Sequence, residues 1–256
     1  MEARSASGFD WRDAAAYAPL LEADRSLFAW EWLRRDPDYR AAAERAIPSG
    51  NARREHPAAA AFGLVAFECP DRAVPHARPL WRSDVHQQVL LVEAIEAAQP
   101  EDHFDICRVG DLATLVTCPG GDHLLLSDGL RMVRLDGPCG VFSRGPACLQ
   151  YRIEGLAAAE QRLPTLRRFL ALCRMGEFAR SLHPTEPRAR RWVLMLRAWD
   201  ALAAGAGHRQ IAEVLLGGSA AEPRWRSREP SLRSQAQRLV RSARSFAAGQ
   251  YRTLLG

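Results

Sequence analysis

The chain has 256 residues, of which 47% are hydrophobic, and its formal net charge is +5. This length allows one large or two small domains with a hydrophobic core. No apolar run approaches the ~20 residues that a membrane-spanning helix requires, and Glu22, Asp24 and Arg25 stand where a signal peptide would have its apolar core. The composition argues against a membrane protein, and we expect a cytoplasmic one.

The charge is divided unevenly along the sequence. Residues 161–256 contain 18 arginines and six acidic residues, a formal +12, whereas residues 1–160 contain 17 arginines and 24 acidic residues, a formal −7. Such a basic region is typical of nucleic-acid binding, because the release of counterions from phosphates supplies sequence-independent affinity. A solvated basic surface is the alternative. Every basic residue is an arginine, which suits phosphate and guanine, but a GC-rich coding sequence produces the same bias.

Residues that could perform catalysis do not gather in any familiar pattern. The six cysteines lack a Cys-x-x-Cys pair, the seven histidines lack a His-Glu-x-x-His motif, and no phosphate-binding glycine motif is present. We therefore expect reduced, half-buried cysteines, no metal, no cofactor and no enzymatic activity. Ser127-Asp128-Gly129 and Ser83-Asp84 are typical of turns.

Residues 9–46 have a helical pattern. Asp24 is placed to cap one helix, and Asp36-Pro37 ends it and begins the next. An aromatic cluster lies in this region: Phe28, Trp30, Trp32 and Tyr39. It predicts a small core or a face that docks on the next domain, with a partner groove as the alternative. We assign residues 1–50 to a helical domain, followed by a linker-like stretch at residues 48–57.

Residues 58–155 are expected to form a β-rich interaction or control domain. Short apolar or alternating runs predict a small antiparallel meander with strands at 62–67, 114–117, 123–126, 132–135 and 148–153. Gly120-Gly121-Asp122 is typical of a hairpin turn between two of them. Residues 85–98 are ambiguous between strand and helix.

Residues 160–256 return to a helical pattern. One helix is expected over 163–182, and the break at 183–187 leaves Thr185 as a cap for the next. Three further helices, each with one apolar stripe, are expected over 188–204, over 208–216 and from Ser231 to Gly249. Because three stripes can close one core, this region is expected to fold and bind duplex DNA on its own.

The last helix is the candidate recognition helix. No acidic residue interrupts residues 231–249, and Arg233, Gln237 and Arg241 are four residues apart, along one ridge that could enter a major groove. Arginine and glutamine can contact guanine and adenine edges, whereas Arg238 and Arg244 were expected to flank the ridge and contact phosphates. With Arg209 from the preceding helix, the candidate DNA-binding residues are Arg209, Arg233, Ser234, Gln237, Arg238, Arg241 and Arg244.

Several motifs in this region resemble the RovC-like DNA-binding domain of proteobacterial transcriptional regulators. They are Arg191-Trp192, Leu196-Arg197-Ala198-x-Asp200, Arg209-x-Ile211-Ala212-x-x-Leu215-x-Gly217, Trp225, Ser231-Leu232-Arg233-Ser234, Arg238-Leu239-Val240 and Gly249-x-Tyr251-Arg252-x-Leu254-Leu255. The N-terminal residues Trp11-Arg12, Tyr17, 28–35 and Pro37-x-Tyr39-Arg40 are similar to a regulator-like domain often found ahead of it.

The resemblance implies a transcription factor, linked in this family to type VI secretion genes or to the activation and excision of integrative and conjugative elements. Two positions depart from the family pattern, since Gly207 stands where a serine cap is common and Gln250 replaces the second glycine of a Gly-Gly-Tyr-Arg ending. Glycine is an acceptable helix cap.

Together these features predict an α+β protein with an N-terminal helical segment, a central antiparallel meander and a C-terminal three-helix domain like a helix-turn-helix. The function expected is a bacterial transcriptional regulator whose partner is double-stranded DNA. The alternative is a protein-interaction module, an antiactivator or adaptor that binds a protein regulator instead of DNA. Self-association of the acidic region through Phe28, Trp30 and Trp32 is a further expectation.

Overall fold

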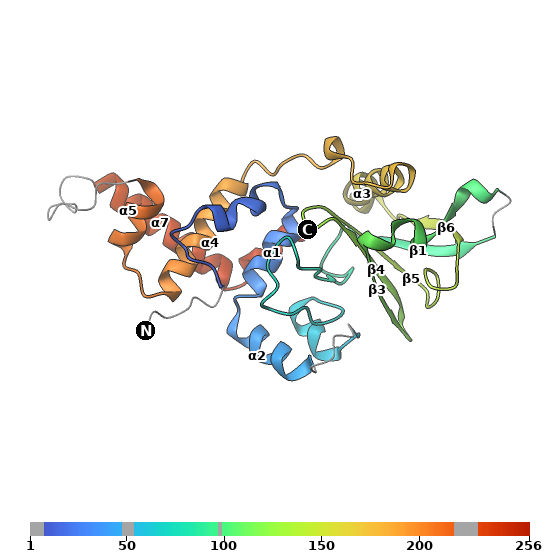
Figure 1. The fold of residues 1–256 in the computed structure, drawn as a ribbon, viewed down its shortest axis with the longest axis horizontal. Helices are drawn as coiled ribbons and strands as arrows, with labels where there is room; N and C mark the ends of the chain where they lie inside the picture. Colours follow the sequence, from blue (N-terminus) through green and yellow to red (C-terminus); the bar gives the residue numbers. More distant parts are fainter. Residues whose placement is uncertain (1–7, 48–53, 97–98, 218–229) are drawn as a thin grey trace.

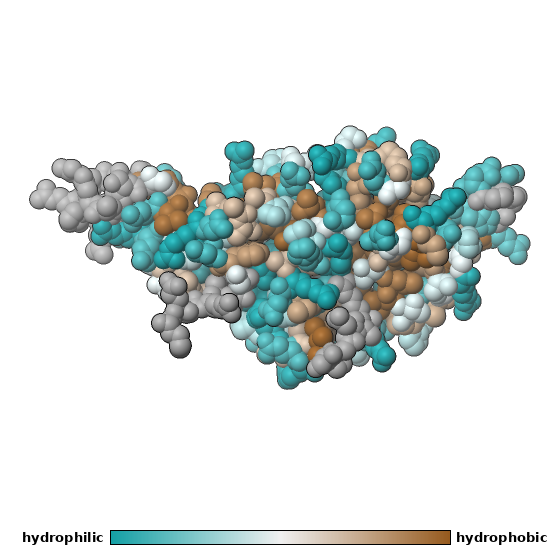
Figure 2. All heavy atoms as spheres, viewed as in Figure 1, coloured by the Kyte–Doolittle hydropathy of each residue, from teal (hydrophilic) through white to brown (hydrophobic). Residues whose placement is uncertain are grey.

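A computed structural model describes residues 8–47, 54–96, 99–217 and 230–256. The molecule is elongated, with helices α4, α5 and α7 at one end, a β-sheet at the other, and α1 and α2 between them (Figure 1). The C-terminus returns to the middle of the molecule, near α1. Figure 2 shows a surface on which hydrophilic residues are interspersed with apolar patches, one of them over the sheet.

The N-terminal region is helical, as the sequence predicts. A 3-10 helix spans Ala15–Glu22, α1 spans Arg25–Leu33 and α2 spans Pro37–Ala46. Asp36 caps α2, because its carboxylate accepts hydrogen bonds from the amides of Asp38 and Tyr39. Asp24 lies at the start of α1, but its carboxylate instead accepts a hydrogen bond from the amide of Met132 at 2.9 Å. This residue therefore joins α1 to the sheet.

Residues 57–86 belong to the helical region and not to the sheet. A 3-10 helix spans Pro57–Phe62, where the sequence predicted the beginning of a strand, and only Leu64 forms an isolated bridge, to Trp81. The side chains of Leu64 and Trp81 are buried in the core that contains α1. The run over 62–67 is apolar because it fills this core, and an apolar run of that length alone does not distinguish strand from loop.

Six strands form one sheet in the order β2-β6-β1-β5-β4-β3. Their bounds are β1 Leu90–Ile95, β2 His103–Phe104, β3 Ala113–Cys118, β4 Gly121–Ser127, β5 Met132–Gly137 and β6 Ala147–Arg152. The predicted meander is confirmed for β3, β4 and β5, which pair antiparallel. The sheet is nevertheless mixed, because β1 pairs parallel with β5 and antiparallel with β6. The ambiguous segment 85–98 thus provides a central strand. Short 3-10 helices at Pro100–Asp102 and Ile106–Leu112 flank β2.

The turn between β3 and β4 contains the predicted glycines. Cys118 pairs with Gly121, and Gly121 has a φ of 147°. A Cβ atom at this position would lie 2.5 Å from the carbonyl oxygen of Gly137 on β5. Glycine is therefore required here by backbone conformation and by the close approach of the neighbouring strand.

Strand β4 lies between two hydrophobic cores. Leu124 and Leu126 face the core under α3, whereas Leu125 faces the core that contains α1, as expected from the alternation of side chains along a strand. Helix α3 spans Leu156–Met175 and packs Phe169 and Leu172 on the sheet. It begins and ends about two turns earlier than predicted: it begins after Gly155, continues through Pro164, and ends at Gly176, which has a left-handed conformation. A 3-10 helix at Arg180–Leu182 follows.

The remaining helices agree with the predicted bounds. Helix α4 spans Ala189–Ala203, α5 spans His208–Leu216, α7 spans Pro230–Ala247, and a 3-10 helix spans Gln250–Leu254. The cap of α4 is Arg188, not Thr185. Gly207 caps α5, and its amide donates a hydrogen bond to the Gln210 side chain at 3.0 Å.

The two cores do not follow the domain boundaries predicted at 1–50, 58–155 and 160–256. One core combines α1 and α2, residues 59–81, and helices α4, α5 and α7. The other combines the sheet with α3. Helix α3 therefore packs with the sheet, although it lies within the predicted C-terminal domain. In the described part of the chain, no helix is long and apolar enough to cross a membrane.

Candidate nucleic-acid interface

Helices α4, α5 and α7 pack against one another at the end of the molecule farthest from the sheet (Figure 1). Their apolar stripes meet as predicted: Trp192, Leu196, Ile211, Ala212, Ala236, Leu239, Val240 and Ala243 are all buried. This packing fixes which side of α7 faces solvent. The predicted helix-turn-helix geometry stays a prediction, since residues 218–229 lie outside the described residues.

The exposed side of α7 carries the predicted basic ridge. Arg233, Gln237 and Arg241 are exposed, and so are Arg238 and Arg244. Among the described residues, none of these four arginines forms an ion pair. Their guanidinium groups therefore remain available for an anionic partner.

The position of Arg244 around the helix differs from the sequence-based assignment. At 3.6 residues per turn, a residue eleven positions after Arg233 lies three turns farther along the same face. In the continuous helix α7, Arg244 thus belongs to the ridge of Arg233 and Gln237, and Arg238 lies to its side. The prediction that both residues flank the ridge therefore holds for Arg238 and is wrong for Arg244.

Two other candidates lie outside this ridge. Ser234 is half-buried on α7, and Arg209 is exposed on α5, which packs against α7. Two positions of the family-like motifs, Trp225 and the side chain of Ser231, lie outside the described residues. The sequence reading gave no DNA-binding role to Arg190, Arg191 or Arg252, which are also exposed. Exposed arginines outside the recognition helix have no periodic signal that could single them out.

A buried ion-pair network connects α1 to α4. The guanidinium of Arg35 pairs with Asp200 through two contacts, at 2.8 and 2.9 Å, and its third nitrogen lies 2.6 Å from Glu31. The Tyr17 hydroxyl donates to Asp200 at 2.6 Å, and burial, followed by the negative charge of Asp200, raises the pKa of this tyrosine. Arg34 donates to Glu31 at 2.8 Å. Despite the cost of burial, these two arginines hold the pKa of Glu31 below its usual value.

The N-terminal aromatic cluster also supports the basic helices. Phe28 contacts Trp192 of α4 with ring centroids 5.0 Å apart, and Trp32 contacts Phe246 of α7 at 5.6 Å. Trp30 and Trp32 are 0% and 2% exposed. The interpretation as a core and docking face is confirmed, and the expectation that this cluster offers an exposed partner surface is wrong.

The same packing bears on the expectation that residues 160–256 fold on their own. Without the N-terminal region, Trp192 and Phe246 would lose their ring partners, and Asp200 would lose Arg35 and Tyr17. The three stripes of α4, α5 and α7 therefore share their core with the N-terminal region instead of closing it alone. Experiments on DNA binding accordingly require the full chain.

The inner end of the ridge opens into a cleft. Arg244, Trp199 and Arg252 line it together with Trp32 and the beginning of α2, around a volume of about 930 Å³. The acidic residues Asp36 and Asp38 also line this cleft. Arg244 thus lies where the basic face of α7 meets the N-terminal region.

The described residues contain no cluster of His, Cys, Asp or Glu that could hold a metal ion. All six cysteines are free, and three of them (Cys107, Cys139 and Cys173) are exposed, so the expectation that they are half-buried holds only in part.

Comparison with known families agrees with the basic three-helix region. Two regions match domains found in transcriptional regulators, one of them a DNA-binding domain. Residues 153–256 match the RovC DNA-binding family, described as the DNA-binding domain of a T6SS transcription factor. Residues 10–64 match the proteobacterial transcriptional regulator-like domain. The resemblance stated from the sequence is confirmed. No curated protein and no solved structure matches the chain.

Proposed function

We propose that this regulator binds promoter DNA through α7, which enters the major groove with the ridge of Arg233, Gln237 and Arg241. The observation that carries the proposal is the exposed face of α7, which is free of acidic residues and has arginines without ion pairs among the described residues. A helix of this length, Pro230–Ala247, provides several turns beside a groove.

The N-terminal region then has a supporting role. The ion pairs of Arg35 and the aromatic contacts of Trp32 hold α4 and α7 against the N-terminal region, so the basic face is presented by a rigid body. The acidic half of the chain is suited to control and not to DNA contact. We propose a cytoplasmic, non-enzymatic regulator of secretion-system or mobile-element genes.

Replacing Gln237 tests whether α7 contacts bases. Gln237→Ala should weaken binding to a site obtained by in vitro selection by about 1–3 kcal/mol, the value of a bidentate base contact, and should leave binding to scrambled DNA unchanged. The matched control is Gln235→Ala, because Gln235 is also exposed on α7 but lies half a turn away. Equal losses on selected and scrambled DNA would show that Gln237 does not contact bases.

Replacing Arg238 tests the phosphate contacts. Arg238→Ala should weaken binding to all duplexes alike and should reduce the slope of log affinity against log salt concentration by about one. Fluorescence anisotropy of the full chain over a salt series measures both quantities. A loss confined to one sequence would reassign Arg238 to base contact.

The alternative function is a protein-interaction module that binds a regulator instead of DNA. It would show no salt-dependent binding to duplex DNA, while co-purification with a protein partner would persist in Arg238→Ala.

A further inference from the structure

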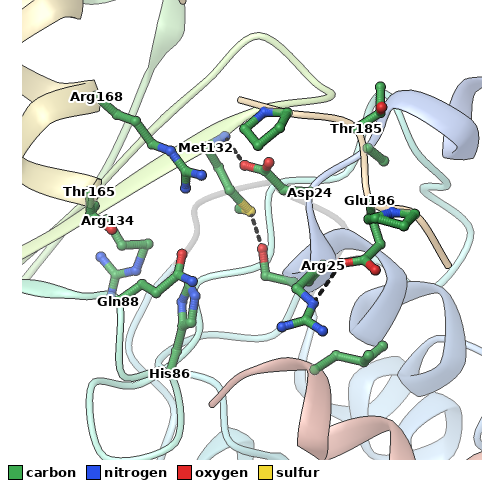
Figure 3. Close-up of a pocket in the computed structure, with 15 residues that line it drawn as sticks. Asp24, Arg25, His86, Gln88, Met132, Arg134, Thr165, Arg168, Thr185 and Glu186 are labelled. Carbon is green, nitrogen blue, oxygen red and sulfur yellow. Dashed lines mark hydrogen bonds and ion pairs between the residues drawn. The ribbon is translucent and has the colours of Figure 1, made fainter. Parts of the chain in front are cut away.

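A second site lies far from the basic face, where three parts of the molecule meet. A pocket of about 300 Å³ is enclosed by the start of α1, strand β5, helix α3, the segment before β1 and residues 184–187, which lead into α4 (Figure 3). Pockets of this size accept small organic molecules. Neither matched family is described as binding one.

Two elements direct polar side chains into this pocket. Thr165 and Arg168 are three residues apart on α3 and therefore share one helix face. His86 and Gln88 are two residues apart in the segment before β1 and line the opposite wall. Figure 3 shows Arg168 approaching the same space as Gln88 and His86.

Several of these groups have no partner among the described residues. Thr165 is 2% exposed and His86 is 6% exposed, yet the Thr165 hydroxyl and the His86 Nδ1 atom make no hydrogen bond. Arg168 uses only its Nε atom, which donates to the Leu182 carbonyl at 2.9 Å, and its two terminal nitrogens remain free. Buried polar groups are normally hydrogen-bonded, so a pocket lined by such groups points to a ligand.

The charges around the pocket indicate the sign of that ligand. Glu186 pairs with Arg25 at 2.9 Å, and Arg134 pairs with Asp136 at 2.8 Å. The Asp24 carboxylate accepts a hydrogen bond from the Met132 amide and lies 3.6 Å from Nδ1 of His183. Arg168, in contrast, forms no ion pair with a described residue, so its terminal nitrogens are available for an anionic group.

Other polar groups of the pocket wall are neutral. Burial, and then the charge of Arg134, lower the pKa of His86 to about 4, so its imidazole is neutral near pH 7. A neutral imidazole and a hydroxyl can each donate or accept a hydrogen bond. One cation and several neutral hydrogen-bonding groups match a singly charged anion better than a phosphate, which carries between one and two charges near neutral pH.

We propose that this pocket binds a small organic monocarboxylate, whose carboxylate contacts the terminal nitrogens of Arg168 while its remaining polar atoms meet Thr165, His86 and Gln88. The wall formed by residues 184–187 continues directly into α4, so a bound ligand would contact both the sheet and the beginning of the DNA-binding helices. Its role as an effector rests on the proposed function, whereas its binding does not.

The histidine side chains provide a direct readout without DNA. In the full chain labelled with ¹⁵N-histidine, the seven imidazoles are observed by long-range ¹H–¹⁵N correlation, and His86→Asn identifies the signal of His86. Acetate, lactate, benzoate and 4-hydroxybenzoate are titrated individually, with benzamide and inorganic phosphate as comparisons. We expect at least one monocarboxylate to shift the His86 signal in a saturable manner, and benzamide to leave it unchanged.

Substitutions in the pocket wall test whether the monocarboxylate binds there. Arg168→Gln should weaken the interaction about tenfold or more, the equivalent of one charge-assisted hydrogen bond, and Thr165→Val should weaken it while preserving side-chain shape. The control is Arg167→Gln, because Arg167 is exposed on the same helix outside the pocket. Circular dichroism verifies that each variant is folded.

Three results would overturn the proposal. These are the absence of any saturable shift at His86, an equal response to inorganic phosphate, or equal affinities in Arg168→Gln and Arg167→Gln. Because no DNA is present, failure of DNA binding by the chain would leave this result unaffected.

Discussion

Asp200→Asn should lower the free energy of unfolding by about 3–5 kcal/mol, as expected when one partner of a buried ion pair is removed. Asp200 is 1% exposed and accepts hydrogen bonds from both Arg35 and Tyr17. Its loss leaves two buried arginines, Arg34 and Arg35, sharing the single carboxylate of Glu31.

Urea denaturation monitored by circular dichroism measures this effect. Asp71→Asn is the matched control, because Asp71 forms an exposed ion pair with Arg40 at 2.7 Å. Exposed pairs contribute about 0–1 kcal/mol. The free energy of unfolding should therefore fall several-fold less in Asp71→Asn than in Asp200→Asn. Equal losses in the two variants would show that the Asp200 network is unimportant for stability.

Trp32→Ala should also destabilise the chain by about 3–5 kcal/mol, since removing a large buried aromatic side chain leaves a cavity. The residue contacts Phe246 on α7, so the folded fraction should also bind DNA less well. Trp30 is buried as well, so replacing both tryptophans should destabilise the chain further.

Trp32→Phe is the conservative counterpart and should retain much of the stability, because a ring still faces Phe246. Urea denaturation and DNA binding of both variants are compared with the parent chain. If Trp32→Ala is as stable as the parent, the cluster does not form the interface with α7.

The sequence predicted the C-terminal helices well because each carries its own apolar stripe and its own end signals. Gly207 begins α5, and Gly217 ends it in a left-handed conformation, while residues 188–204 show regular apolar spacing. The meander of β3, β4 and β5 could also be predicted from the sequence, since a short turn at Gly120-Gly121 joins alternating runs.

Features that depend on contacts between residues far apart in the chain could not be predicted from the sequence. The parallel pairing of β1 with β5 joins Leu90 to Leu135, and no local signal encodes it. The spacing of Glu31 and Arg35 is compatible with a pair on one helix, but the third partner, Asp200, lies 165 residues away.

The candidate site was predicted in part. Exposure of Arg233, Gln237 and Arg241 follows from the apolar stripe on the opposite side of α7. The pocket around Arg168 was not predicted, since its walls come from segments that lie far apart in the sequence. A single sequence shows the periodicity of each segment but not which segments meet.

The most direct test of the central claim is a salt series on the full chain with duplex DNA obtained by in vitro selection, measured by fluorescence anisotropy. If α7 and neighbouring arginines neutralise phosphates, log affinity should fall linearly with log salt concentration, with a slope of about −0.9 for each phosphate contacted. Replacing Arg233, Arg238 and Arg241 by glutamine should then make this slope shallower. Absence of binding at low salt, or an affinity that does not change with salt, would contradict the claim that this chain binds DNA through the basic face of α7.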